Sequence, residues 1–190
     1  MHISDEELIL LHLDGDINAF PKLAERHQNA IFRFALSLCK SRQDAQDISQ
    51  NTFVNVYLSL PKSKTHLSFK PWLFTICANL CKNLFRKKKS INFTELEHIN
   101  NEGEALSIVN TIPDTKEDAQ STLYKKELQE VVKKAIETLP DKYKVIITMR
   151  YFDDFSLKEI SKILEIPVNT VKTQIKRAKT NLEHHLKHIL

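Results

Sequence analysis

The spacing of apolar residues is helical wherever this chain shows a sustained pattern. Between residues 20 and 38, for example, apolar side chains recur mainly at intervals of three and four, which places them along one side of a helix. Only two glycines and six prolines occur in 190 residues, fewer than hairpins and barrels need for their turns. The sequence therefore predicts an all-α fold.

The segment 90–121 has no such period and divides the chain. It contains Gly103 and Pro113, and it holds seven acidic residues against one basic residue. The flanking segments, 1–89 and 122–190, each carry a net charge of +5. We expect two small helical domains, 1–89 and 122–190, joined by a flexible acidic linker. The two basic blocks suggest contact with a polyanion, although an ordinary solvated lysine surface has the same composition.

Capping residues mark the helix starts in the first block. Ser4 and Glu7 form a capping box before the first helix, and Asp16 can cap the second. Ser41 precedes the third helix. The expected ends of these three helices are Gly15, residue 40 and Pro61, and a fourth helix is expected over about residues 69–88.

The stretch 155–182 has the pattern of a short helix, a break and a second, basic helix. Ser156 and Glu159 form a capping box for the short helix, and Pro167 disfavours helix at the residue before it. The second helix has an apolar stripe whose members lie four, three and four residues apart: Val171, Ile175, Ala178 and Leu182.

The other faces of this second helix offer cations and small hydroxyls, at Thr170, Lys172, Thr173, Lys176, Arg177, Lys179 and Thr180. One face packed on a core and one cationic face are typical of a helix-turn-helix, whose second helix enters the DNA major groove. Lysine and arginine donate to guanine edges, and threonine contacts a thymine methyl group or a phosphate. An amphipathic hairpin with a solvated basic face is the simpler alternative. The capped first helix, the proline break and the apolar stripe together favour DNA binding.

The fourth expected helix combines cations with aromatic residues, as single-stranded nucleic-acid sites do. Its cations are Lys70, Lys82, Arg86, Lys87, Lys88 and Lys89, and its aromatic residues are Phe69, Trp72, Phe74 and Phe85. Packing in a hydrophobic core is the alternative role for the aromatic residues. We favour the core for Phe74 and Phe85, and both roles stay open for Trp72.

No residue pattern points to catalysis, a metal or a cofactor. The sequence has no nucleophile–base pair, no metal-ligand cluster and no glycine-rich phosphate loop, so we expect no enzymatic activity. Cys77 and Cys81 lie four residues apart, and small buried thiols explain them better than a metal pair does. The acidic N-terminal segment and the lack of an eighteen-residue apolar run predict a cytoplasmic protein without membrane insertion.

Three blocks of the sequence together resemble a known protein family. FSLKEISKILEIPVNTVKTQIKRAKTNL (155–182) resembles the C-terminal helix-turn-helix of bacterial extracytoplasmic-function (ECF) sigma factors. DAQDISQNTFVNVY (44–57) resembles the family's segment that grips the coiled coil of the largest RNA polymerase subunit. SFKPWLFTICANLCKNLFRKKK (68–89) resembles its promoter-melting helix. The blocks stand in the family's order, with the family's linker between them.

The resemblance implies a protein that binds core RNA polymerase and directs it to promoter DNA. It also implies an anti-sigma factor as a partner that keeps the protein inactive. Residues 1–89 would be the sigma region 2 domain, which binds polymerase and melts the −10 element, and 122–190 the region 4 domain, which reads the −35 element. The loop over residues 61–67 would capture a flipped −10 base, and the linker would thread the RNA path of the polymerase or act as a plain tether.

By position, the resemblance also implies three sets of contact residues. The −35 set is Asn169, Thr170, Lys172, Thr173, Lys176 and Arg177; the −10 set is Lys70, Trp72, Asn79, Asn83, Arg86 and Lys87; the polymerase-binding set is Asp44, Asp47, Gln50, Asn51 and Phe53. A merely solvated face is the alternative for the third set. Asn51 and Asn83 stand where the family usually has acidic residues, and Asn169 stands where it usually has glycine.

Two other functions are compatible with parts of this pattern. A stand-alone helix-turn-helix regulator would bind operators without polymerase, but it has no use for the melting-helix block. An RNA-binding or anti-termination factor could also use two basic domains.

Overall fold

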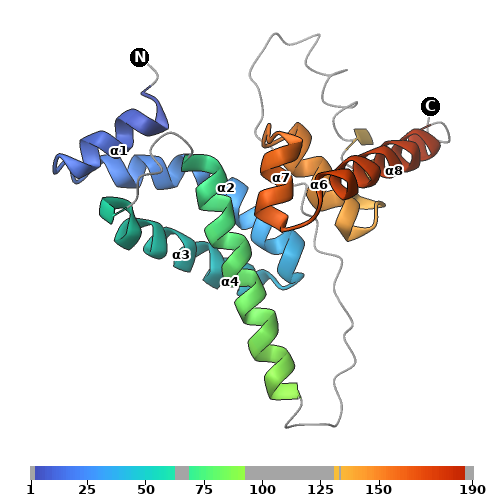
Figure 1. The fold of residues 1–190 in the computed structure, drawn as a ribbon, viewed down its shortest axis with the longest axis horizontal. Coiled ribbons are helices and arrows are strands. Elements are labelled where there is room, and N and C mark those ends of the chain that lie inside the picture. The colour runs from blue at the N-terminus through green and yellow to red at the C-terminus, as the bar shows by residue number, and fades with distance from the viewer. Residues whose placement is uncertain (1–2, 63–68, 93–130, 133, 187–190) are drawn as a thin grey trace. The chain divides into compact units, whose positions relative to one another are not determined.

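The computed structural model of the protein describes residues 3–62, 69–92, 131–132 and 134–186, and every regular element within these ranges is a helix (Figure 1). The predicted all-α fold is therefore confirmed. The described helices belong to two compact units, the first with α1 to α4 and the second with α6, α8 and most of α7. Most of the predicted loop over residues 61–67 and most of the predicted acidic linker lie outside the described residues.

The first unit consists of three helices packed against a central helix, α2. Helix α2 contacts α1, α3 and α4, and α3 also packs against α4, the long green helix of Figure 1. The elements of this unit are α1 (Asp5–Leu13), α2 (Ala19–Cys39), α3 (Arg42–Ser59), the 3₁₀ turn η1 (Leu60–Lys62) and α4 (Phe69–Asn92).

The helix caps of this unit are mostly local and match the prediction. Ser4 and Glu7 exchange both hydrogen bonds of a capping box, and the Ser41 hydroxyl accepts from the amide of Asp44 at 3.3 Å. The prediction that Asp16 caps α2 was wrong, because the N-cap residue is Asn18. The Asp16 carboxylate instead accepts the Asn18 amide at 2.8 Å, so it stabilises the turn before the helix.

The core of the first unit forms where α2 meets α4. The rings of Phe34 and Phe74 lie 5.0 Å apart, and both side chains are buried, as predicted for Phe74. The prediction that Phe85 is a core residue was wrong, because its side chain is 45% exposed. Phe85 lies eleven residues beyond Phe74, in the part of α4 where neighbouring side chains are also exposed.

The second unit contains α6 (Asp141–Tyr151), α7 (Leu157–Leu164) and α8 (Val168–Leu186), preceded by helical residues 134–137. Helix α8 packs on α6. One core cluster joins α6, α8 and the residues before α6, with Ile136, Leu139, Tyr143, Ile147 and Ala178 buried in it and Val132 and Leu182 packed against it.

Helix α7 and the turn after it have the predicted form. The capping box of Ser156 and Glu159 is present, with the Ser156 amide donating to Glu159 Oε2 at 2.8 Å. Glu165 then takes a left-handed conformation, with φ of 54°, and ends α7. The Ser161 hydroxyl donates to the carbonyl of Ile166 at 2.6 Å, which ties the turn back onto α7.

Candidate nucleic-acid interface

Helix α8 presents two faces of opposite character. Val171 and Ala178 are fully buried, and Ile175 and Leu182 are half-buried, so the predicted apolar stripe does face inward. The predicted −35 residues lie on the remaining surface of its first half. Of these, Asn169, Lys172, Thr173, Lys176 and Arg177 are exposed, and Thr170 is half-buried. The packing of α8 therefore leaves a row of cations and small polar groups free of the core.

Two threonine hydroxyls on this helix, those of Thr173 and Thr180, are engaged with the helix itself. Thr173 Oγ1 donates to the carbonyl of Asn169 at 2.8 Å, and Thr180 Oγ1 donates to that of Lys176 at 3.2 Å. A hydroxyl that donates its hydrogen to the preceding turn keeps only its acceptor lone pairs for another partner. In this arrangement, Thr173 offers an acceptor and a methyl group rather than a donor.

A contact that the sequence analysis missed lies farther along the same helix. Lys179 Nζ lies 5.3 Å from the centroid of the Tyr151 ring at the end of α6. The Tyr151 side chain is 49% exposed, so this cation–π contact is on the surface of the unit. The two residues are 28 positions apart, and no local pattern links them.

Four of the six predicted −10 residues lie on one side of the middle part of α4. Asn79, Asn83 and Lys87 are spaced by four residues, Arg86 follows Asn83 by three, and all four side chains are exposed. Arg86 Nη2 donates to Asn83 Oδ1 at 3.2 Å. Asn83 therefore orients a cation, although it lacks the charge that the family usually places there.

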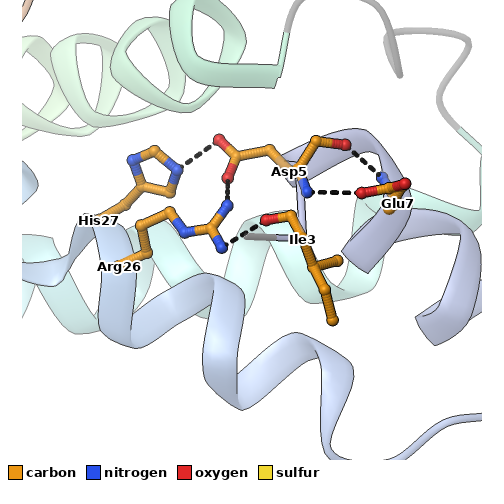
Figure 2. Close-up of polar contacts among 6 residues, drawn as sticks. Ile3, Asp5, Glu7, Arg26 and His27 are labelled. Atoms are coloured by element: carbon orange, nitrogen blue, oxygen red, sulfur yellow. Dashed lines mark hydrogen bonds and ion pairs between the residues drawn. The ribbon is translucent and has the colours of Figure 1, made fainter. Parts of the chain in front are cut away.

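Trp72 lies near the start of α4, within a series of rings that contact one another edge-on or tilted. The centroid of its half-buried indole is 6.1 Å from that of Phe69, and Phe69 is 5.6 Å from the imidazole of His27. His27 is itself buried, and its Nε2 lies 2.6 Å from Asp5 Oδ2 (Figure 2). These ring contacts, together with the His27–Asp5 contact, connect Trp72 to α1 through α2. Lys70, the remaining member of the −10 set, is half-buried.

Asp5 anchors the N-terminal end of α1 to α2. Arg26 donates to Asp5 Oδ1 and, through Nη2, to the carbonyl of Ile3 at 2.7 Å (Figure 2). Partial burial alone raises the pKa of Asp5, but the hydrogen bonds and charges of His27 and Arg26 outweigh it and hold that pKa below its ordinary value. The carboxylate is therefore stabilised in its charged form.

Helix α3 exposes a mixed polar and apolar face. Asp47, Gln50 and Asn51, from the predicted polymerase-binding set, are exposed, and Phe53 is half-buried. Val54 and Leu58 continue the same side of the helix and are 54% and 65% exposed. These two residues were not predicted, although their spacing of three and seven from Asn51 could have indicated them.

Asp44, another member of that set, pairs with a lysine of α4. Its Oδ2 atom lies 2.6 Å from Lys88 Nζ, which joins the first turn of α3 to the basic part of α4. The Asp44 side chain is 19% exposed and that of Lys88 is 54% exposed.

The described residues contain neither a membrane span nor a metal site. No helix in that part of the chain is long and apolar enough to cross a membrane. The same residues contain no group of three or more histidine, cysteine or carboxylate side chains arranged to hold a metal ion.

Comparison with known proteins identifies both halves of the chain. Residues 23–91 match the family described as Sigma-70 region 2, and residues 129–182 match Sigma-70, region 4. The first match contains most of the helices of the first unit, and the second contains α6, α7 and most of α8.

Full-length relatives agree with these matches. The ECF RNA polymerase sigma factor SigW of Bacillus subtilis is 31% identical over 173 residues, which cover 91% of each chain. The ECF RNA polymerase sigma-E factor of Haemophilus influenzae is 27% identical over 188 residues, covering 99% of this chain and 98% of that protein. The sigma factor RpoE of Bartonella quintana, solved with the anti-sigma factor NepR, has a similar fold, with a TM-score of 0.58, 22% identity and coverage of 90% and 98%. The chain therefore belongs to the family of ECF RNA polymerase sigma factors.

Proposed function

We propose that this protein binds core RNA polymerase and directs it to specific promoters, with its two units dividing the work. Residues 1–89 bind polymerase and open the −10 element, residues 122–190 read the −35 element, and residues 90–121 link them. The observation that carries this proposal is the exposed cationic face of α8, within a region 4 match, in a chain that also matches region 2.

The first half of α8 reads the −35 element in the major groove. Lys172, Lys176 and Arg177 donate to guanine edges or to phosphates, and their exposure supports this role. Thr173 contributes a methyl group and an acceptor, because its hydroxyl hydrogen is used within the helix. Asn169 and Thr170, at the start of α8, lie where a recognition helix approaches base edges and phosphates.

The exposed side of α4 holds the separated −10 strand. Asn79, Asn83, Arg86 and Lys87 line a continuous polar and cationic track, which suits a sugar–phosphate backbone. Lys70 and Trp72 act at the start of this helix, where the edge-on contact with Phe69 holds the Trp72 indole in place for stacking on a base.

The exposed face of α3 binds the polymerase. Asp47, Gln50 and Asn51 supply its polar contacts, and Val54 and Leu58 add apolar area that water otherwise covers. Phe53 contributes the exposed part of its side chain. The Asp44 carboxylate already pairs with Lys88, so its main role is to hold α3 and α4 together beside this face rather than to contact the polymerase.

We further propose that the protein catalyses nothing itself, acts in the cytoplasm and is held silent by an anti-sigma factor. The solved complex of Bartonella quintana RpoE with NepR supports the last point, since its sigma factor shares this fold. The rival function of a stand-alone regulator is not favoured, because such a protein needs no region 2.

Reconstituted transcription tests the proposal. Purified protein is mixed with bacterial core polymerase and a pool of templates whose −35 and −10 elements are randomised, and transcripts are sequenced. We expect start sites only with both proteins present, downstream of two enriched elements at fixed spacing. Tight binding to duplex by the protein alone, without transcripts, would indicate a stand-alone regulator instead. Binding to RNA but not to templates would indicate an RNA-binding factor.

A further inference from the structure

Three buried cysteines meet where the end of α2 packs on the middle of α4. Cys39 is the last residue of α2, and Cys77 and Cys81 lie one turn apart on α4. All three are free thiols, with exposed fractions of 9%, 0% and 1% in chain order. Cys39 Sγ lies only 3.5 Å from Cys81 Sγ, although the two residues are 42 positions apart.

This distance puts the two sulfur atoms in direct contact. A disulfide bond has an S–S length of about 2.05 Å, so closure needs an approach of about 1.5 Å, a distance that side-chain rotation can supply. We propose that Cys39 and Cys81 are an oxidation site, at which an intramolecular disulfide forms and joins α2 to α4.

A Cys39–Cys81 bond would have a different effect from a bond between Cys77 and Cys81, which lie close together in the sequence. A bond between Cys77 and Cys81 would join α4 only to itself. A bond between Cys39 and Cys81 closes a loop over residues 40–80, which contains all of α3. Closing a long loop restricts the unfolded chain, so the Cys39–Cys81 bond stabilises the first unit against unfolding.

Hydrogen peroxide is a sufficient oxidant for the reaction. Cys39 is the most exposed of the three thiols, so its thiolate attacks the peroxide, forms a sulfenic acid and releases hydroxide. Cys81 then attacks the Cys39 sulfur and displaces the sulfenic oxygen as water. In total, two thiols and one peroxide molecule give one disulfide and two water molecules, and a thiol reductant reverses the bond.

The surroundings of the pair make this oxidation slow at neutral pH. The hydrogen bond to Cys81, together with burial, raises the pKa of Cys39 far above its ordinary value. For Cys81 the hydrogen bond from Cys39 lowers the pKa, but the bond with Cys77 and burial together raise it above its ordinary value. Because the thiolate is the reacting species, the rate of disulfide formation should rise about tenfold for each pH unit near neutrality.

Peptide mapping of the wild-type protein tests the proposal directly. The folded protein is treated with hydrogen peroxide, unfolded in urea, alkylated with N-ethylmaleimide and digested with trypsin without reduction. Cys39 falls in the tryptic peptide 34–40, whereas Cys77 and Cys81 share the peptide 65–82, since Pro71 blocks cleavage after Lys70. We expect these two peptides linked, with the maleimide on Cys77, and separated by dithiothreitol.

Two results of that map would overturn the proposal. One is unlinked peptides, with Cys39 carrying the maleimide after peroxide treatment. The other is a bond within peptide 65–82, which would make Cys77 and Cys81 the oxidised pair. Because the map uses the wild-type chain, neither result depends on whether a variant folds.

Single substitutions give a second, independent measurement. Cys77→Ala should keep both the linked peptides and a rise of several degrees in the thermal midpoint on oxidation. Cys39→Ala should lose both, while its circular dichroism remains helical. An equal rise in the midpoint of oxidised Cys39→Ala would show that the stabilisation comes from another source and would overturn the link between oxidation and the Cys39–Cys81 bond.

Discussion

Lys88 Nζ lies 2.6 Å from Asp44 Oδ2, and this ion pair joins the helix proposed to bind polymerase to the helix proposed to hold the promoter strand. Asp44 belongs to the proposed polymerase-binding set and Lys88 lies beside the proposed strand-binding residues of α4, yet each is partly neutralised by the other. A partner that draws Lys88 away therefore also changes the charge that Asp44 presents. The pair couples two proposed surfaces through a single contact.

A double-mutant cycle measures that contact. Asp44→Ala, Lys88→Ala and the combined variant should give a coupling free energy of about 0.2–1 kcal/mol in urea unfolding, because Lys88 is largely exposed. The coupling should fall toward zero in 1 M salt, where screening is strong. Coupling that persists unchanged at high salt would show that the two residues interact other than by charge.

Arg177→Ala should weaken binding of the polymerase holoenzyme to its selected promoter by about 1–3 kcal/mol if Arg177 contacts a base. A phosphate contact would instead weaken binding to all sequences alike and reduce the salt slope by about one. Fluorescence anisotropy over a series of salt concentrations distinguishes the two. Lys134→Ala, at an exposed lysine outside α8, is the matched control and should leave binding unchanged. Wild-type affinity in Arg177→Ala would remove this residue from the interface.

Phe74→Ala and Phe85→Ala should have very different effects on stability. Phe74 is fully buried against Phe34, so its truncation leaves a cavity and should cost about 3–5 kcal/mol of unfolding free energy. Phe85 is 45% exposed, and its truncation should change stability by less than about 0.5 kcal/mol. Urea unfolding followed by circular dichroism measures both. Similar losses in the two variants would contradict the positions of these rings.

Asp5→Asn should lower the unfolding free energy at pH 7 by roughly 1–2 kcal/mol, because charged hydrogen bonds to Arg26 and His27 are weakened. The pKa of Asp5 is lower in the folded chain than in the unfolded chain. Its contribution is therefore complete above about pH 4 and is lost as the pH falls through the folded pKa.

As the pH falls below about 4, the unfolding free energy of Asp5→Asn should therefore decrease less than that of the wild type. Urea unfolding across this range gives the two slopes. Glu6→Gln, at an exposed carboxylate in the same helical turn, is the matched control and should keep the wild-type slope. Parallel slopes for Asp5→Asn and the wild type would argue against a linked titration at Asp5.

Ser156→Ala should destabilise the second unit by about 1 kcal/mol, because the Glu159 amide loses its capping acceptor. Ser156→Asp should restore most of that stability, since aspartate is also a strong N-cap residue. Thermal unfolding of the three proteins checks the order. Equal midpoints for Ser156→Ala and the wild type would show that the cap contributes nothing to the fold.

The sequence by itself determined the local structure and the family. The caps at Ser4, Ser41 and Ser156 and the buried stripe of α8 were all predicted, because capping and helical periodicity depend on residues within four positions of one another. The sequence blocks that resemble the family are likewise short continuous stretches of the chain. The prediction for Asp16 failed within the same range, because two further residues form a turn before α2 begins.

Only the tertiary structure decided which distant residues meet. The contacts of Asp5 with His27, Asp44 with Lys88 and Cys39 with Cys81 join residues 22, 44 and 42 positions apart. The exposure of Phe85 likewise depends on where α4 runs beyond its neighbours. Such contacts arise from the packing of helices against one another. The apolar period of one helix shows which face is buried, but it does not show which other helix that face will contact.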